Sequence, residues 1–246
     1  MAPKPNIKDQ PSPTPQNRER AAIASLFQRI APRYDLLNRI LSLGLDGSWR
    51  RALIRLVNPR PGETLLDLAA GTLDVSLAVL GACKEVNVVA ADISPSMLAV
   101  GKGKAVGRGT RLLPVVGDGL ALPLPEAVVD VVVTSFGIRN ISPRSEAFQE
   151  ILRVLKPGGR LGILEFGGGK PPVFGGFYHA LLDRVPPLLG RWLAHDEAAY
   201  RYLAQSIKIF PPPKDLAREM AKAGFQDVRQ KPLMGGILYL HLGRKA

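Results

Sequence analysis

Hydrophobic and polar positions divide the chain into three stretches of different period. Up to about residue 60, apolar residues recur at helical spacing among arginines. From there to about residue 169, short apolar runs alternate with helical segments, and the last stretch returns to helical spacing before two closing runs. The first stretch predicts three helices, over Ala21–Ile30, Tyr34–Leu43 and Leu45–Val57.

The middle stretch has the pattern of a parallel β-sheet. Its apolar runs show little alternation, which is typical of strands that are buried on both faces. The five predicted strands are Thr64–Leu66, Val86–Ala91, Arg111–Val116, Val128–Thr134 and Arg160–Phe166. Helical segments separate these strands, so that we expect a sheet covered by helices. The predicted helices are Thr72–Leu80, one that begins after the N-cap Ser94, and Ser145–Leu155.

The C-terminal stretch adds helices and closes the sheet. A Gly- and Pro-rich loop follows Phe166, and the pattern then predicts helices over His179–Leu193, Glu197–Ile209 and Lys214–Ala223, with strands over Phe225–Gln230 and Gly236–Gly243. The sequence therefore predicts an α/β fold. We expect a Rossmann-like, seven-stranded, mostly parallel sheet with helices on both faces, an N-terminal helical extension, and a helical insertion after strand 5.

The predicted boundaries give one domain and a tail. Five prolines in the first fifteen residues indicate a disordered tail over 1–18, followed by a single domain over 19–246. Within it, the helical extension spans 19–60 and the insertion spans 170–212. The N-terminus is not a signal peptide, and no apolar run approaches the roughly 18 residues of a spanning helix. We expect a cytoplasmic protein.

The charge of the chain is +12, and it is unevenly distributed. Residues 1–60 carry a net +7, residues 61–169 a net −1, and residues 170–246 a net +6. A basic balance of this size suggests a polyanionic partner, which is either nucleic acid or an anionic membrane surface. Cys83 is the only cysteine, and no His, Cys or carboxylate spacing is typical of a metal site. We expect no disulfide and no metal ion.

Polar residues follow four of the predicted strands, at the strand ends where open α/β sheets bind ligands. The turn after the first strand carries one glycine and lacks the three-glycine dinucleotide fingerprint. An acid after the second strand commonly accepts hydrogen bonds from ribose hydroxyls, and the acid after the third is placed to meet an adenine amino group. These residues are Asp67, Gly71 and Thr72 after the first strand, Asp92 after the second, Asp118 and Gly119 after the third, and Ser135 after the fourth.

Together these residues resemble the class I S-adenosylmethionine-dependent methyltransferases. Further motifs, from about residue 20 to the C-terminus, resemble the menaquinone/ubiquinone biosynthesis C-methyltransferases. They are Phe27–Asn38, Leu41–Arg50, Ser135–Asn140, Lys156–Phe166, Tyr200–Ile207 and Gly235–His241. The resemblance implies transfer of a methyl group from S-adenosylmethionine to a ring carbon of a polyprenylated quinol. We favour demethylmenaquinol, because the stretch that ends at Asp46 looks more like the menaquinone branch.

The resemblance also implies roles for individual residues. Thr72, Asp92, Asp118, Gly119 and Ser135 would contact the cofactor. The catalytic candidates are Arg139, which would stabilise a quinolate and position a water, and Asn140, which would hold that water. Four residues of the helical extension and insertion would line the substrate side, and they are Tyr34, Asp35, Asp46 and Tyr200. We expect a lipid quinol substrate, contact with an anionic membrane surface and no nucleic acid, and a homo-oligomer is compatible with the sequence.

One position departs from the family pattern. The family usually has glycine where this chain has Leu73. We favour the interpretation that Leu73 already lies in the first helical turn, where leucine is a good helix former. Some crowding of the cofactor would remain, so a Leu73→Gly variant is expected to bind S-adenosylmethionine more tightly.

Two other classes of function are weighed against this one. An RNA methyltransferase would account for the charge, but only 6% of the residues are aromatic and no Asn-Pro-Pro-Tyr-like loop follows the fourth strand. A non-catalytic cofactor-binding partner of a quinone-biosynthesis complex would account for Leu73, and the acids at the strand ends argue against it. His195 and His241 are alternative bases, although a lone histidine is more often structural.

Overall fold

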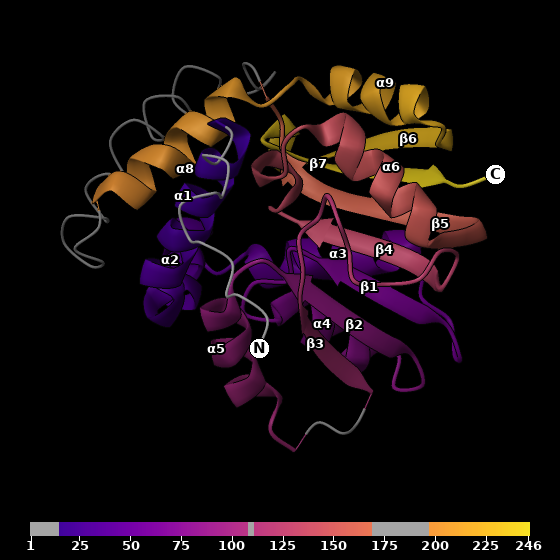
Figure 1. The fold of residues 1–246 in the computed structure, drawn as a ribbon, viewed down its shortest axis with the longest axis horizontal. Helices are drawn as coiled ribbons and strands as arrows, with labels where there is room; N and C mark the ends of the chain where they lie inside the picture. The colour runs from indigo at the N-terminus through magenta and orange to yellow at the C-terminus, as the bar shows by residue number, and fades with distance from the viewer. Residues whose placement is uncertain (1–14, 108–110, 169–196) are drawn as a thin grey trace, which may run out of the picture.

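The computed structural model describes residues 15–107, 111–168 and 197–246 (Figure 1). Seven strands form one sheet in the order β3-β2-β1-β4-β5-β7-β6, and β7 runs antiparallel to β5 and β6 while β1–β5 are parallel. The predicted seven-stranded, mostly parallel sheet is therefore confirmed. Its strands are β1 (Thr64–Leu68), β2 (Asn87–Asp92), β3 (Leu112–Val116), β4 (Val129–Ser135), β5 (Leu155–Phe166), β6 (Gln226–Leu233) and β7 (Leu238–Arg244).

Helices cover both faces of the sheet, because the central strands carry apolar side chains on each side. One face packs against α3 (Asp46–Val57), α4 (Asp74–Ala82) and α5 (Pro95–Ala105). The other packs against α6 (Arg144–Val154) and α9 (Pro213–Ala223). The predicted N-cap of α5 is confirmed, since the Ser94 hydroxyl accepts a hydrogen bond from the Met97 amide.

The N-terminal helices gather at one end of the sheet. Beside α1 (Pro15–Ile30) lie α2 (Tyr34–Leu41) and α8 (Glu197–Ile209), and in Figure 1 the three helices stand together to the left of the strands. A small apolar cluster joins them, with Leu26 of α1 and Leu37 of α2 buried against Tyr202 of α8. The extension and the end of the insertion therefore form one cover.

Two predicted boundaries are wrong. Residues 15–18 are helical, although the tail was expected to reach residue 18. Proline suits the first turn of a helix, where its missing N–H costs nothing, so Pro15 begins α1 and does not end a tail. Strand β5 already begins at Leu155, where a register shift in its pairing with β4 lets the chain pass Gly158 and Gly159 without leaving the sheet. Residues 1–14 and the predicted helix His179–Leu193 lie outside the described residues.

Two features are absent from residues 15–107, 111–168 and 197–246, a membrane-spanning helix and a metal-binding cluster. No helix there is long and apolar enough to cross a membrane. No group of three or more His, Cys, Asp or Glu side chains there could hold a metal ion.

Candidate active site

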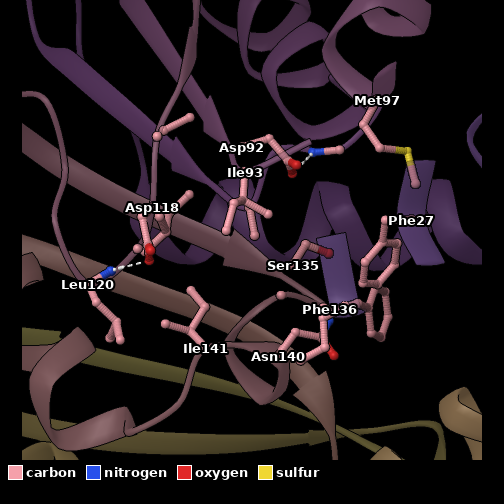
Figure 2. Close-up of a pocket in the computed structure, with 18 of the residues that line it drawn as sticks. Phe27, Asp92, Ile93, Met97, Asp118, Leu120, Ser135, Phe136, Asn140 and Ile141 are labelled. Atoms are coloured by element: carbon pink, nitrogen blue, oxygen red, sulfur yellow. Dashed lines mark hydrogen bonds between the residues drawn. The ribbon is translucent and has the colours of Figure 1, made fainter. Parts of the chain in front are cut away.

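A cavity opens at the C-terminal ends of β1, β2, β3 and β4, beneath the cover of α1 and α2 (Figure 2). Five of the residues predicted at the strand ends line it, which are Gly71, Asp92, Asp118, Gly119 and Ser135. The cover contributes Ile23, Phe27 and Tyr34. In the view of Figure 2, Asp118 and Phe27 lie on opposite sides of this space. The sheet end and the helical cover thus form the two walls of one site.

Asp92 fixes the turn that carries the first glycine. One of its carboxyl oxygens accepts a hydrogen bond from the Gly71 amide and the other accepts one from the Ser94 amide, each at 2.8 Å. Burial raises the pKa of the Asp92 carboxyl, and the two amides oppose that shift. Each oxygen keeps a further lone pair, so Asp92 can accept hydrogen bonds from a ligand's hydroxyl groups.

Glycine is required at two points of this wall. Gly71 has a φ of +53°, which side chains rarely adopt, and a Cβ there would lie 3.9 Å from the Tyr34 ring. Gly119 leaves room for Ile141, whose side chain would lie 2.7 Å from an added Cβ. Next to it, Asp118 accepts a hydrogen bond of 2.9 Å from the Leu120 amide. The backbone therefore approaches the cavity closely at both turns.

Asp67 does not line the cavity, although the sequence placed it with the cofactor residues. It is buried beneath the turn, where its carboxyl accepts hydrogen bonds from the Ser76 amide at 3.0 Å and the Ser76 hydroxyl at 2.6 Å. Burial raises the pKa of Asp67 to about 7, despite those two hydrogen bonds. Asp67 thus ties β1 to the first turn of α4 and shapes the turn from below.

Thr72 also points away from the cavity and joins an ionic network. Its hydroxyl donates a hydrogen bond of 2.5 Å to Asp35 of α2, and Lys104 of α5 lies 2.7 Å from the same carboxylate. Lys104 also contacts Asp74 at the start of α4. The network therefore attaches α2 to the turn after β1. Asp35 serves that attachment and is not among the residues that line the cavity.

Arg50 of α3 extends this network. Its guanidinium lies 2.5 Å from Asp46 and 3.2 Å from Asp74. Asp46 in turn accepts a hydrogen bond of 3.1 Å from Ser42. Asp46, expected on the substrate side, instead anchors the start of α3 and does not line the cavity.

The expectation that Leu73 lies in the first helical turn is wrong. Its φ of 66° and ψ of 18° are left-handed, and α4 begins after it, at Asp74. A leucine in this conformation costs about 1–2 kcal/mol. Its side chain is fully buried, and a Cβ on Gly101 would lie 2.3 Å from its Cγ. Since Leu73 packs beneath α5 and does not line the cavity, crowding of the cofactor is no longer a reason to expect tighter binding by Leu73→Gly.

The turn after β4 carries a strained aromatic residue. Phe136 has a φ of +57° and lies between Trp49 of α3, which it meets edge-on, and Phe166 of β5, to which it is tilted, with ring centroids 6.2 and 5.0 Å away. Bulky residues rarely adopt this conformation, and such strain is concentrated at functional sites. Phe136 and its neighbour Ser135 both line the cavity. Among the described residues, the buried Ser135 hydroxyl has no hydrogen-bond partner, so it is available to a ligand.

Arg139 lies behind the cavity wall, on the short helix η3 (Ile138–Asn140). Its guanidinium donates a hydrogen bond of 2.6 Å to Glu165 and stands 6.0 Å from the Phe136 ring and 5.6 Å from the Phe166 ring. Both charged side chains are almost fully buried. Burial raises the pKa of the Glu165 carboxyl, against the charge of Arg139. Glu165 belongs to a motif of the family resemblance, but sequence reasoning gave it no role.

Asn140 lines the cavity directly and connects the sheet end to α8. Its side-chain oxygen accepts a hydrogen bond of 3.0 Å from the Tyr202 hydroxyl. Tyr202 was missed as a candidate, since the sequence favoured Tyr200 of the same motif. Tyr200 lies in α8, but its side chain is outside the described residues. Only the relative placement of α8 and η3 singles out Tyr202.

Tyr34 and the two candidate histidines remain to be placed. Tyr34 lines the cavity beside Phe27, at a ring-centroid distance of 6.2 Å, and burial raises the pKa of its hydroxyl. His241 is buried in β7, where its Nε2 lies 3.0 Å from the Pro213 carbonyl and must therefore carry the hydrogen. Burial lowers the pKa of His241, because it disfavours the charged ring. His195 lies outside the described residues.

The cavity has a composition that suits S-adenosylmethionine. Its described lining includes two carboxylates and no lysine, arginine or histidine, although the whole chain has a charge of +12. Such a site favours a cationic ligand. Asp92 can bind ribose hydroxyls, and the rings of Phe27, Tyr34 and Phe136 can face a sulfonium cation. The fold and this lining define the chain as an S-adenosylmethionine-dependent methyltransferase of class I.

Comparison with known proteins identifies the family within this class of methyltransferases. The sequence pattern of the ubiE/COQ5 methyltransferase family matches residues 15–245, so the chain belongs to that family. The chain is 43% identical to a demethylmenaquinone methyltransferase of Thermus thermophilus, over 89% of this chain and 99% of the relative. It is 39% identical to a ubiquinone/menaquinone biosynthesis C-methyltransferase of Ectopseudomonas mendocina, over 94% and 91%.

A solved structure shares the fold at low sequence identity. It is phosphoethanolamine N-methyltransferase 2 of Haemonchus contortus in complex with S-adenosyl-L-methionine. The TM-score is 0.62 at 16% identity, over 80% of this chain and 52% of that one. At this identity the likeness supports the fold alone.

Proposed function

We propose that this methyltransferase moves the methyl group of S-adenosylmethionine to a ring carbon of a polyprenylated quinol, with demethylmenaquinol converted to menaquinol. The observation that carries the proposal is the pairing of two unlike walls in one cavity. Asp92 and Asp118 offer polar contacts at the strand ends, whereas Ile23 and Phe27 offer an apolar surface across from them. Family membership agrees with this substrate class.

The chemistry is shared between the cofactor and the chain. Bound S-adenosylmethionine supplies an activated methyl group, so the residues must hold the quinol ring in line with it and exclude water. A ring hydroxyl would give its proton to water, the C–C bond would form as the bond from sulfur to methyl breaks, and the ring carbon would lose its proton to water as the ring oxygen is reprotonated. Ser135 and Asn140, which both line the cavity, can hold a ring oxygen or that water.

Arg139 acts from behind this wall. Its positive charge lies beside Phe136, and its pairing with Glu165 fixes η3 and hence Asn140. An arginine is always protonated, so Arg139 does not serve as the base; from behind the wall and paired with Glu165, it positions Asn140. If turnover of an Arg139→Ala enzyme at unchanged quinol affinity equals that of wild type, Arg139 has no such role.

Labelled methyl transfer tests the proposal against its alternatives. Wild-type protein is given S-adenosylmethionine with a labelled methyl group and, in parallel, a demethylmenaquinol analogue, a benzoquinol analogue or bulk RNA. Label in the naphthoquinol product is the expected result, and label in the benzoquinol would assign the other quinone branch. Label in RNA would identify an RNA methyltransferase, and label in none of the three, with cofactor binding intact, would identify a non-catalytic partner.

We also propose a location in the cytoplasm at the inner face of the cell membrane. A prenylated quinol resides in the bilayer, and the excess positive charge of residues 1–60 and 170–246 favours an anionic leaflet. Extraction of the host membrane and identification of its quinone would independently test which ring the enzyme methylates.

A further inference from the structure

The outer face of α2 carries apolar side chains that the fold does not use. Leu36, Ile40 and Leu43 follow one another at helical spacing, and 54%, 37% and 86% of their respective surfaces are exposed. The adjoining side of the same helix is already occupied, because Leu37 is buried against Leu26 of α1. We call Leu36, Ile40 and Leu43 the α2 outer face.

Leu43 is the least expected member of this face. It follows α2 with a φ of +51°, a conformation that favours glycine or asparagine. At 86% exposure the side chain buries almost no area in the folded protein. Neither the backbone nor the core accounts for a leucine here, whereas a contact outside the chain would.

The charges around the α2 outer face are positive. Arg33 and Arg39 are exposed, and no contact of either side chain is found among the described residues. The acids that are nearest in sequence point elsewhere, since Asp35 is bound by Lys104 and Asp46 by Arg50. An apolar stripe between two free arginines is the pattern of a helix that lies in the interface of an anionic membrane.

The position of this face fits the proposed substrate. Tyr34 begins the same helix and lines the cavity, while Phe27 of the neighbouring α1 lines it from the cover. In Figure 1, α2 stands at the edge of the molecule, away from the sheet. A helix is about 10–12 Å across, so a bilayer on the outer face would lie within one helix diameter of the cavity wall.

We infer that the α2 outer face inserts into the anionic leaflet of a bilayer and places the cavity where a lipid quinol can enter. The three apolar side chains enter the region between headgroups and acyl chains, and Arg33 and Arg39 pair with lipid phosphates. This inference rests on the proposed quinol substrate, and it adds the surface through which that substrate is reached.

Vesicle binding tests the inference on the full chain. The probes are vesicles of phosphatidylcholine with and without phosphatidylglycerol, at low and high salt. The wild type is expected to bind the anionic vesicles and to be released by salt. Substitution of Leu36→Ser, Ile40→Ser and Leu43→Ser together is expected to weaken that binding about tenfold or more. A matched control, Val106→Ser with Leu113→Ser, removes two exposed apolar side chains elsewhere and should bind as the wild type does.

A charge variant keeps the test informative if the triple variant folds poorly. Arg33→Glu with Arg39→Glu leaves the apolar stripe intact and should lose binding to anionic vesicles alone. Methylation of a short-tailed, soluble demethylmenaquinol analogue should be unchanged in both variants, whereas methylation of a long-tailed quinol in vesicles should fall with binding.

Three results would overturn the inference. They are a wild type that does not bind anionic vesicles, a triple variant that binds them as tightly as the wild type, and a wild-type dimer in light scattering that the triple variant converts to monomers without loss of vesicle binding. The last result would assign the face to a second copy of the chain. Failure of the proposed function looks different, since the wild type would then bind vesicles and methylate neither quinol.

Discussion

The two walls of the cavity are built by different means. The strand-end wall is held by backbone geometry, because Asp92 binds two main-chain amides and Asp67 binds the first turn of α4. The cover is held by side chains, namely the ionic contacts of Asp35 and the hydrogen bond from Tyr202 to Asn140. The cofactor site is therefore fixed by the sheet, whereas the substrate side depends on how α1, α2 and α8 attach to it.

The largest loss of stability is expected at the buried ion pair of Arg139 and Glu165, which supports the junction of the two walls. Arg139→Ala would leave Glu165 buried without its partner and cost about 3–5 kcal/mol in the free energy of unfolding. Urea unfolding measures this. Replacing both residues by apolar ones, Arg139→Met with Glu165→Leu, should recover most of the loss. Equal stability of Arg139→Ala and the wild type would show that the pair is not a buried support.

The same variant should depend on pH in a defined direction. Burial raises the folded-state pKa of Glu165 above its ordinary value of 4.5, and removal of Arg139 raises it further. The folded state then binds the proton more tightly than the unfolded state, so the contribution of Glu165 to stability is complete below about pH 4.5 and is lost as pH rises through its folded pKa. Unfolding at a series of pH values should show a steeper fall for Arg139→Ala than for the wild type. A loss that is constant with pH would contradict this origin.

Substitution of Asp92 tests the strand-end wall alone. Asp92→Ala removes the acceptor of the Gly71 and Ser94 amides and the carboxylate that faces the cavity. Affinity for S-adenosylmethionine should fall about 100-fold, as expected when charged hydrogen bonds are lost. Calorimetric titration measures this affinity. The Asp92→Asn variant keeps one acceptor oxygen, so its affinity should lie between those of the wild type and Asp92→Ala. Unchanged affinity in Asp92→Ala would remove Asp92 from the cofactor site.

Asp67 supports the strand-end wall from beneath and does not line the cavity. Its folded-state pKa of about 7 exceeds the ordinary 3.8, so its contribution to stability is complete below about pH 4 and is lost as pH rises through 7. Asp67→Asn lacks this titration, and above neutral pH it should be more stable than the wild type by about 1–3 kcal/mol. Thermal unfolding across pH tests this. Its cofactor affinity should stay near that of the wild type, and a large loss would place Asp67 in the site.

The same difference between the walls explains what the sequence could predict. Strand ends are a consequence of the fold, so Asp92, Asp118 and Ser135 could be found from the order of apolar runs. The role of Asp35 could not, because its ion pair with Lys104 joins residues that are far apart in the chain. The partners of Asp46, Ser42 and Arg50, are each four residues away, but that spacing alone does not say which way the carboxylate points. A family motif identifies such residues without saying which way they point.

Leu73 shows the other limit of sequence reasoning. Helix propensity favoured a place in the first turn of α4, but the observed left-handed conformation is set by the tight turn after β1. The cost is offset by burial in a space that only Gly101 leaves open. The strain and the burial that offsets it can be recognised only once the packing of α5 on Leu73 is known.

The smallest effect is expected where the two walls meet through one hydrogen bond. Tyr202→Phe removes the hydroxyl that donates a hydrogen bond to Asn140. The loss of this hydrogen bond costs about 1 kcal/mol, so kcat/KM for the quinol should fall less than tenfold. Affinity for S-adenosylmethionine should not change, because Tyr202 does not line the cavity. Tyr200→Phe is the matched control on the same helix. If Tyr200→Phe lowers kcat/KM and Tyr202→Phe does not, the contact between α8 and η3 plays no part in holding the substrate, and the cover acts through Tyr200.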